Sequence, residues 1–269
     1  MKDVQSEKDS RGLTLNAVGI SGLAWPVTVK SLEGTNQHTA AVFQLATRCP
    51  AEQKGIHMSR LVEALDLVTA TSALDMCALA LVICSMSGED WVNIRAEFDY
   101  FSKVFAPASG RPSPLHVRVA EEVALDETGL SRSIEVIVPI TTLCPCSKEI
   151  SDYGAHNQRS SVQITVVPSN EDACPHFEQL IEMAKKSGSA QVYPLVKRCD
   201  EREITMQAFD NPKFVEDVVR DLALRLLQRE DLYSFHVKCT SIESIHAHQA
   251  FAEYSWTRGD GAEEEIENG

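Results

Sequence analysis

The feature of this sequence that most constrains its fold is an order of secondary-structure patterns that occurs twice. In the first half, two alternating segments that predict strands are joined by a turn at Gly34-Thr35-Asn36. Apolar residues at helical spacing follow from His57, and a Ser72-x-x-Asp75 capping box predicts the start of a second helix. Two more strand patterns close this half. The predicted strands cover residues 23–30, 38–46, 94–105 and 115–124.

The second half repeats the same order. A helix is predicted at about 176–187, closed by Gly188, and a stronger helix is predicted to start at Asn211 as its cap, with Pro212 in the first helical position. The strand patterns of this half lie at 134–140, 162–167, 234–244 and 248–255. Strand-strand-helix-helix-strand-strand therefore occurs twice, which predicts an α+β fold built from a duplicated unit.

The composition indicates a folded protein with an acidic surface. The 269 residues are 43% hydrophobic and 24% charged, which is enough for a substantial core. The net charge of −14 argues against a nucleic acid or an acidic membrane as a partner. Five acids and no base lie in residues 259–269. The patterns predict a flexible lead at 1–15, modules at 16–126 and 127–256, and an acidic, disordered tail at 257–269.

The eight cysteines favour a reduced protein over a disulfide-linked one. The N-terminal segment has mixed charge and no secretory pattern, and the cysteines are scattered over a long chain. Cys77 and Cys84 lie in an apolar helical run and Cys239 in an alternating strand, so these three are interpreted as buried hydrophobic residues. No apolar run reaches the ~18 residues of a membrane span. We therefore expect a soluble, cytoplasmic protein.

Residues 141–160, TTLCPCSKEISDYGAHNQRS, hold the densest group of reactive side chains. Cys144 and Cys146 precede His156 by twelve and ten positions. Thiolates and imidazoles are ligands that catalytic divalent metals use. The segment is polar and follows a predicted strand, so we interpret it as a functional loop. Two inert structural thiols are the alternative interpretation.

Two later acids are less specific. Glu201 belongs to the charged run at 197–202, which is also typical of a solvated turn. Glu216 would be the fifth residue of the helix predicted from Asn211, one position away from its apolar stripe. An acid there is also explained by the helix dipole alone.

A pair of histidines follows near the end of the predicted sheet. His246 and His248 alternate with Ala247, which predicts that both lie on one face of a strand. Glu243 has the opposite parity and would lie on the other face unless the chain bends. A structural or surface histidine pair is the alternative interpretation.

These segments together resemble the type IB GTP cyclohydrolases, the FolE2 branch of the tunnelling-fold superfamily. Residues 141–160 are similar to the family's signature sequence, and the resemblance extends over about residues 17–256. The other similar segments, in the expected order, are residues 37–39, 54–60, 197–201, 211–217 and 243–248.

The resemblance implies a fold, an activity and an assembly. The fold is two tandem tunnelling-fold modules, each an antiparallel four-stranded sheet with two helices on one face. The activity is hydrolysis of GTP to formate and 7,8-dihydroneopterin triphosphate, the first step toward folate-type pterins or deazaguanines. The assembly is a homotetramer with active sites at subunit interfaces. One divalent metal, Mn, Zn or Fe(II), serves each active site.

Carried over position by position, the resemblance also implies roles for single residues. The metal ligands are Cys144, His156 and Glu201, with Cys146 as a second candidate for the catalytic thiol. Glu216 holds the guanine ring, because a carboxylate accepts two hydrogen bonds from N1–H and the 2-amino group. The acid–base groups are Glu243 and His246, with His248 as an alternative. The candidate ligands of the triphosphate are His57, Arg60, Lys148 and Arg159.

One position departs from the family pattern. Cys199 stands where the family usually has Pro, and it places a third thiol two residues before Glu201. A non-catalytic metal-binding protein and an NADPH-dependent nitrile reductase of the same superfamily are the alternative functions. His156 and the segment 243–248 favour the cyclohydrolase over both.

Overall fold

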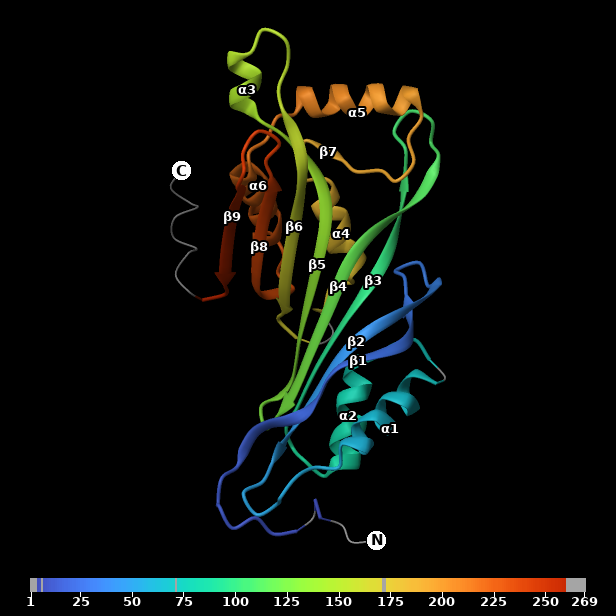
Figure 1. The fold of residues 1–269 in the computed structure, drawn as a ribbon, viewed down its shortest axis with the longest axis vertical. Helices are drawn as coiled ribbons and strands as arrows, with labels where there is room; N and C mark the ends of the chain where they lie inside the picture. The colour runs from blue at the N-terminus through green and yellow to red at the C-terminus, as the bar shows by residue number, and fades with distance from the viewer. Residues whose placement is uncertain (1–3, 6, 71, 171–172, 260–269) are drawn as a thin grey trace. The chain divides into compact units, whose positions relative to one another are not determined.

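The chain forms a mixed α/β fold with an antiparallel sheet. A computed structural model describes residues 4–5, 7–70, 72–170 and 173–259 (Figure 1). Its strands are β1 Leu15–Lys30, β2 Asn36–Cys49, β3 Val92–Phe105, β4 Pro112–Asp126, β5 Gly129–Leu143, β6 Asn157–Pro168, β7 Ala190–Gln191, β8 Leu232–Ile242 and β9 Gln249–Thr257. The six helices of the described residues are α1 Met58–Thr69, α2 Met76–Ser87, α3 Pro145–Ile150, α4 Phe177–Lys185, α5 Arg198–Asp210 and α6 Val215–Leu227.

The strands are hydrogen-bonded in the order β1-β2-β3-β4-β5-β6-β8-β9, and β7 pairs with β5. The chain divides into two compact units, each made of two stretches of sequence. The first unit comprises Met1–Asp99 and Ala120–Ser133, and the second comprises Tyr100–Val119 and Ile134–Gly269. Residues 260–269 of the predicted acidic tail at 257–269 lie outside the described residues, and the predicted module boundaries stay a prediction.

In the first unit, a long β1–β2 hairpin carries two helices. The predicted strand at 23–30 is confirmed, but β1 begins at Leu15. Gly22 has a φ of 72°, and the β1–β2 register shifts between Ser21 and Leu23. This irregularity interrupts the alternation from which the strand was predicted. Helices α1 and α2 lie side by side (Figure 1) and bury their apolar faces. The largest fully buried side chains here include Phe43, Leu45, Leu61, Leu65, Leu79 and Ile83.

The start of α2 corrects the predicted capping box. Asp75 is the N-cap, and its carboxylate accepts a hydrogen bond from the Ala78 N–H at 2.9 Å. Ser72 is not the cap, because its hydroxyl donates to the Val68 carbonyl at 3.0 Å. Both residues fit a capping sequence, but Ser72 is bonded to the end of α1.

In the second unit, α6 packs on β8 and β9 (Figure 1). The predicted helix is confirmed, but its start is not Asn211. Asn211 is the C-cap of α5, and α6 begins at Val215 with Phe214 as N-cap. The residue before a proline is disfavoured in helical conformation, so Pro212 ends α5 instead of opening α6. The Asn211 side chain donates to the carbonyl oxygens of Gly188 and Ser189.

The helix predicted at 176–187 is α4, but Gly188 does not cap it. The helix ends at Lys185, with Lys186 as C-cap. A Cβ atom at Gly188 would lie 2.8 Å from the Thr141 carbonyl oxygen and 3.0 Å from Ile140 Cβ. Gly188 is therefore required for the close approach of this segment to β5, not for helix termination.

Helix α5 was not predicted, and a solvated turn was only the alternative interpretation of the charged run 197–202 at its start. Of its residues, only Asp200 and Ala208 are buried, so the apolar stripe that reveals a helix is almost absent. The Asp200 carboxylate is fully buried and accepts hydrogen bonds from the N–H groups of Ala108 (2.9 Å), Ser109 (2.7 Å) and Lys197 (2.8 Å). It also accepts one from the Ser109 hydroxyl at 2.7 Å. Asp200 thus fastens the β3–β4 turn to the start of α5.

These hydrogen bonds predict a pH dependence of stability. Burial raises the pKa of Asp200, but the hydrogen bonds from Ser109, Lys197 and Ala108 outweigh it and lower the pKa to about 2. Because the folded-state pKa is below the usual 3.8, the stabilisation is complete above that value and is lost as pH falls toward 2. We expect Asp200→Asn to lower the urea midpoint at neutral pH, and the difference from wild type to shrink on acidification.

The measurement is urea unfolding at fixed protein concentration from about pH 6 to about pH 2. Asp66→Asn, at an exposed position of α1, is the matched control and should leave the midpoint close to wild type. An Asp200→Asn midpoint equal to that of wild type at neutral pH would contradict the role of Asp200 as a clamp.

Candidate active site

The ends of β5 and β6 bring Cys144 and His156 together. These strands are antiparallel neighbours, and their register runs to the pair Leu143 and Asn157. The next residue on each strand continues this pairing, because the Cys144 N–H donates to the His156 carbonyl at 3.1 Å. Twelve positions of sequence therefore separate two side chains that stand opposite each other at the base of one loop.

The segment between these residues was predicted as a polar loop, but it begins with the short helix α3. Cys144 is the N-cap of α3, and its sulfur accepts a hydrogen bond from the Ser147 N–H at 3.4 Å. Pro145 occupies the first helical position, where its missing N–H costs nothing. A backbone N–H directed at the sulfur is a partner that a thiolate accepts.

One cavity of the second unit, of about 560 Å³, gathers most of the predicted site residues. Seven of these residues line it: Cys144, Cys146, His156, Glu216, Glu243, His246 and His248. The cavity is also lined by Gln158, Lys213, Phe214 and Phe251, which the sequence analysis did not single out. Thiol, imidazole and carboxylate groups thus face one space.

Glu216 is presented by a well-anchored helix. It is the second residue of α6, not the fifth, because the helix starts at Val215. Asp217 accepts a hydrogen bond from the Phe214 N–H at 2.9 Å, which fixes the first turn. Lys213, just before α6, donates to Asp221 at 2.5 Å and to the Ser187 carbonyl at 3.0 Å. Lys213 could have been chosen as a candidate site residue, because it lies in the segment 211–217 that resembles the family. Its ion pair with Asp221 could not have been predicted from the sequence.

The histidine pair lies in a loop and not on a strand. The β8–β9 register ends with the pair Ile242 and Gln249, so residues 243–248 form the hairpin loop. The rings of His246 and His248 stack with centroids 4.9 Å apart. Glu243 lines the same cavity, because the chain leaves the strand after Ile242 and strand parity no longer applies. Its carboxylate lies 4.0 Å from His156 Nδ1, with both side chains about 15% exposed.

Five predicted residues are not among those that line this cavity, and three of them, Glu201, Arg159 and Lys148, belong to the same unit. Glu201 is an exposed residue in the first turn of α5, and Arg159 is exposed on β6. The Lys148 ammonium donates to the Phe209 carbonyl at 2.5 Å and lies over the Phe209 ring. In the part of the chain that the structure describes, no three His, Cys, Asp or Glu side chains are grouped so that they could hold a metal ion.

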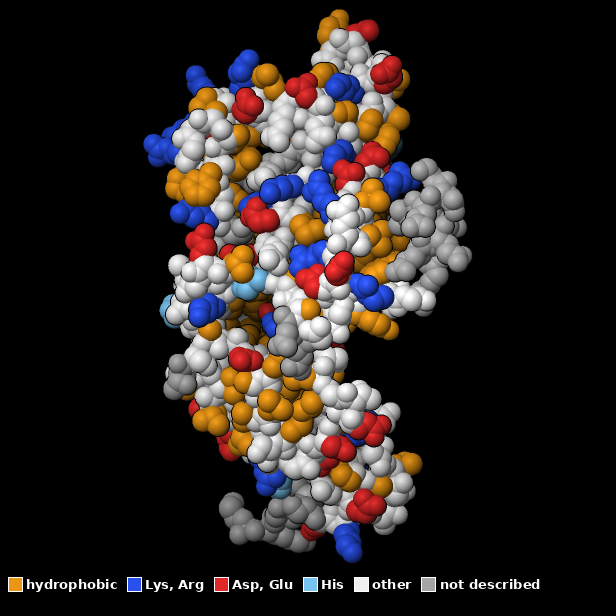
Figure 2. All heavy atoms as spheres, turned by 180° about the vertical axis from the view of Figure 1, so that it is seen from behind, with side chains coloured by type: hydrophobic (Ala, Val, Ile, Leu, Met, Phe, Trp, Pro, Cys, Tyr) orange, Lys and Arg blue, Asp and Glu red, His pale blue; other side chains and the backbone are white. Residues whose placement is uncertain are grey.

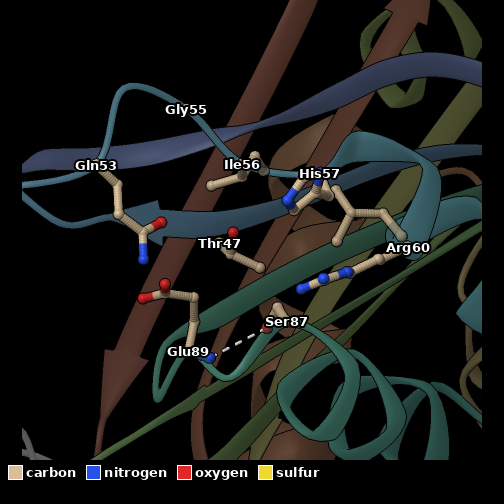
Figure 3. Close-up of a pocket in the computed structure, with 9 residues that line it drawn as sticks. Thr47, Gln53, Gly55, Ile56, His57, Arg60, Ser87 and Glu89 are labelled. Atoms are coloured by element: carbon tan, nitrogen blue, oxygen red, sulfur yellow. Dashed lines mark hydrogen bonds between the residues drawn. The ribbon is translucent and has the colours of Figure 1, made fainter. Parts of the chain in front are cut away.

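His57 and Arg60 line a smaller cavity of about 120 Å³ in the first unit (Figure 3). The Arg60 guanidinium donates to the Met86 carbonyl at 3.3 Å. Glu89 faces the same cavity, and burial together with the charge of Asp90 raises its pKa. The buried Thr47 hydroxyl has no hydrogen-bond partner among the described residues. This cavity therefore combines a cation, an imidazole and a carboxylate.

Charges of both signs lie on the surface of the molecule. On the face drawn in Figure 2, Lys and Arg side chains are interspersed with Asp and Glu. A basic stripe of the kind that follows a nucleic-acid backbone is not seen on that face. None of the helices that the structure describes is long and apolar enough to cross a membrane.

Solved structures with a similar fold include uricases. The uricase from Arthrobacter globiformis matches with a TM-score of 0.57 at 6% identity, over 91% of this chain and 94% of its own. A uricase from Bacillus fastidious matches with a TM-score of 0.53 at 12% identity, over 95% of this chain and 96% of its own. At these identities the likeness concerns the fold alone.

Sequence relatives are far closer. The GTP cyclohydrolase FolE2 of Neisseria gonorrhoeae is 42% identical over 253 residues, which cover 93% of this chain and 96% of the relative. That of Dictyoglomus thermophilum is 41% identical over 260 residues, covering 96% of this chain and all of the relative. The family model described as type I GTP cyclohydrolase folE2 matches residues 1–252. The chain therefore belongs to the type I GTP cyclohydrolase FolE2 family.

Proposed function

We propose that this protein is a GTP cyclohydrolase that hydrolyses GTP to formate and 7,8-dihydroneopterin triphosphate. The observation that carries the proposal is the cavity in which Cys144, His156, Glu216 and Glu243 meet the histidine pair. The reaction needs groups that activate water, hold a purine and move protons. This chain belongs to the GTP cyclohydrolase family, and its cavity contains thiol, imidazole and carboxylate side chains that are suited to these tasks.

The chemistry of the cavity suits a divalent metal in part. Cys144 and His156 supply one sulfur and one nitrogen ligand, which together favour Zn, Fe(II) or Mn over Mg or Ca. We propose these two residues as the primary ligands, with Glu201 as the third and Cys146 as the alternative thiol. When bound, the metal supplies Lewis-acid activation of water at neutral pH.

The remaining residues bind the base and move protons. Glu216 accepts hydrogen bonds from guanine N1–H and the 2-amino group, because a carboxylate matches that pair of donors. His246 or His248 donates a proton to guanine N7, with Glu243 as the nearby partner. Phe214 and Phe251 give the cavity apolar walls, against which a planar ring packs.

The proposal also includes the assembly. We propose two tandem tunnelling-fold modules in each chain and a homotetramer with active sites at subunit interfaces. Glu201 does not line the cavity of its own chain, and His57 and Arg60 lie in the other unit. In the proposed tetramer, these residues and the surface bases Lys148 and Arg159 complete the metal and triphosphate sites. The product enters the synthesis of folate-type pterins or deazaguanines.

The test of the function is formate release from GTP. Purified protein is stripped with chelator and then supplied with Mn, Zn or Fe(II) separately. We expect metal-restored formate together with a product that becomes a fluorescent pterin on oxidation. No formate with any metal, from protein shown to be folded and tetrameric, would reject the proposal. NADPH oxidation with a deazaguanine nitrile would then support the reductase alternative.

Two substitutions test the metal ligands. Cys144→Ala and His156→Ala are each expected to abolish metal binding and formate release, because each removes a primary ligand. Metal content after gel filtration and formate release are both measured. Cys146→Ala decides between the thiols: retained metal content assigns the ligand to Cys144. Wild-type turnover with full metal content in either Cys144→Ala or His156→Ala would refute the assignment.

A third substitution tests the base-binding acid. Glu216→Gln replaces one oxygen acceptor by an NH₂ donor, which opposes the donors of guanine. Hydrogen bonds to a charged group contribute about 1.5–3 kcal/mol, so we expect GTP affinity to fall roughly tenfold to hundredfold. Glu230→Gln, at an exposed position just after α6 that does not line the cavity, is the matched control and should leave GTP affinity at the wild-type value. Unchanged GTP affinity in Glu216→Gln would place the anchor of the base elsewhere.

A further inference from the structure

The geometry points to Gln158 as a positioning residue that holds His156 in the tautomer whose Nε2 lone pair is available to a metal. This inference rests on the proposed role of His156 as a ligand. The His156 Nδ1 and Gln158 Oε1 atoms are 2.9 Å apart. The two residues are two positions apart where β6 begins, so their side chains project to the same side of the chain.

The Gln158 amide has a second partner on β5. Its Nε2 donates to the Thr142 hydroxyl at 3.1 Å, and Thr142 is its direct partner in the β5–β6 register. The Thr142 and Ser160 hydroxyls are 2.7 Å apart, and both residues are at most 2% exposed. In the structure the amide therefore directs its NH₂ group to this buried pair and its carbonyl oxygen to His156.

A carbonyl oxygen accepts and cannot donate, so His156 Nδ1 must carry the proton of this hydrogen bond. In a neutral imidazole the other nitrogen, Nε2, is then unprotonated. Among the described residues, Nε2 has no hydrogen-bond partner. The chain of hydrogen bonds from Ser160 through Thr142 and Gln158 to His156 therefore leaves the Nε2 lone pair of a cavity-lining residue available. Metal-binding histidines are commonly held in this way by a partner on the opposite ring nitrogen.

The neutral amide also separates two functions in a crowded cavity. Glu243 lies 4.0 Å from the same Nδ1, beyond hydrogen-bond distance. Without Gln158, the Glu243 carboxylate would be the nearest acceptor for the Nδ1 proton. Gln158 thus leaves Glu243 available for the proton transfer proposed above, while it fixes the direction of the His156 ring.

The test uses Co(II) as the probe metal and requires no turnover. Thiolate-to-Co(II) absorption reports ligation by cysteine, and competition with a chromophoric chelator gives the dissociation constant. Gln158→Met keeps the volume of the side chain but removes the acceptor, and we expect it to weaken Co(II) binding about 10- to 100-fold. Gln158→Glu keeps an acceptor toward Nδ1 and is expected to stay within about threefold of wild type.

Gln163→Met is the matched control. Gln163 lies on the same strand and donates to Glu135 at 2.8 Å, and it does not line the cavity. It is expected to bind Co(II) like wild type. If Gln158→Met does not fold, Thr142→Val, which removes the acceptor that orients the amide, must weaken Co(II) binding in the same direction.

Wild-type Co(II) affinity in Gln158→Met, or equal losses in Gln158→Met and Gln158→Glu, would overturn the inference. Wild-type protein without thiolate-to-Co(II) absorption would overturn it as well, because its premise would be gone. Normal Co(II) binding by wild type without formate release rejects only the proposed activity. In that case the comparison of Gln158→Met with Gln158→Glu still decides the role of Gln158.

Discussion

The candidate active site depends on how the end of β5 is held. The hydrogen bond from Cys144 to His156 extends the β5–β6 ladder by one pair and closes the loop between them. Leu143, the last residue of β5, is tied to three other segments. Its N–H donates to the Ser189 hydroxyl, its carbonyl accepts from the Lys213 N–H, and its side chain packs with Ala208 of α5. Residues distant in sequence are therefore positioned from one strand end, as catalytic geometry requires.

The same strand end explains the electrostatics of the cavity. Lys213 is brought there by its backbone hydrogen bond to Leu143, but its ammonium is neutralised by Asp221. Glu216 and Glu243 add negative charge to a protein whose net charge is already −14. The charge of the cavity thus favours the N–H donors of a purine and disfavours a triphosphate. This imbalance is the physical reason to expect bases from outside this cavity to bind the phosphates.

The sequence predicted most strands and helices because one face of each is buried, which leaves a period of two or 3.6 in the chain. The predicted helix boundaries were wrong where a local sequence fits two different positions in a helix. Ser72 and Asp75 both fit a cap, and Asn211-Pro212 fits the end of one helix as well as the start of the next. Helix α5 was missed because it buries almost no apolar side chain. The reactive residues of the cavity were found from their chemistry, whereas Gln158 and Lys213 act through partners that tertiary structure alone supplies.

The hydrogen bonds at the start of α5 explain why Cys199 is tolerated in place of the proline expected there. Proline, the residue expected there from the family resemblance, favours the first turn of a helix because its N–H is not needed. Cys199 is the second residue of α5 and is exposed, so its backbone N–H can bond to water. The start of α5 is fixed instead by Asp200, which accepts hydrogen bonds from Lys197 and from the β3–β4 turn. Because this clamp does not involve residue 199, the neighbouring Glu201 keeps its position on α5 whether residue 199 is Pro or Cys.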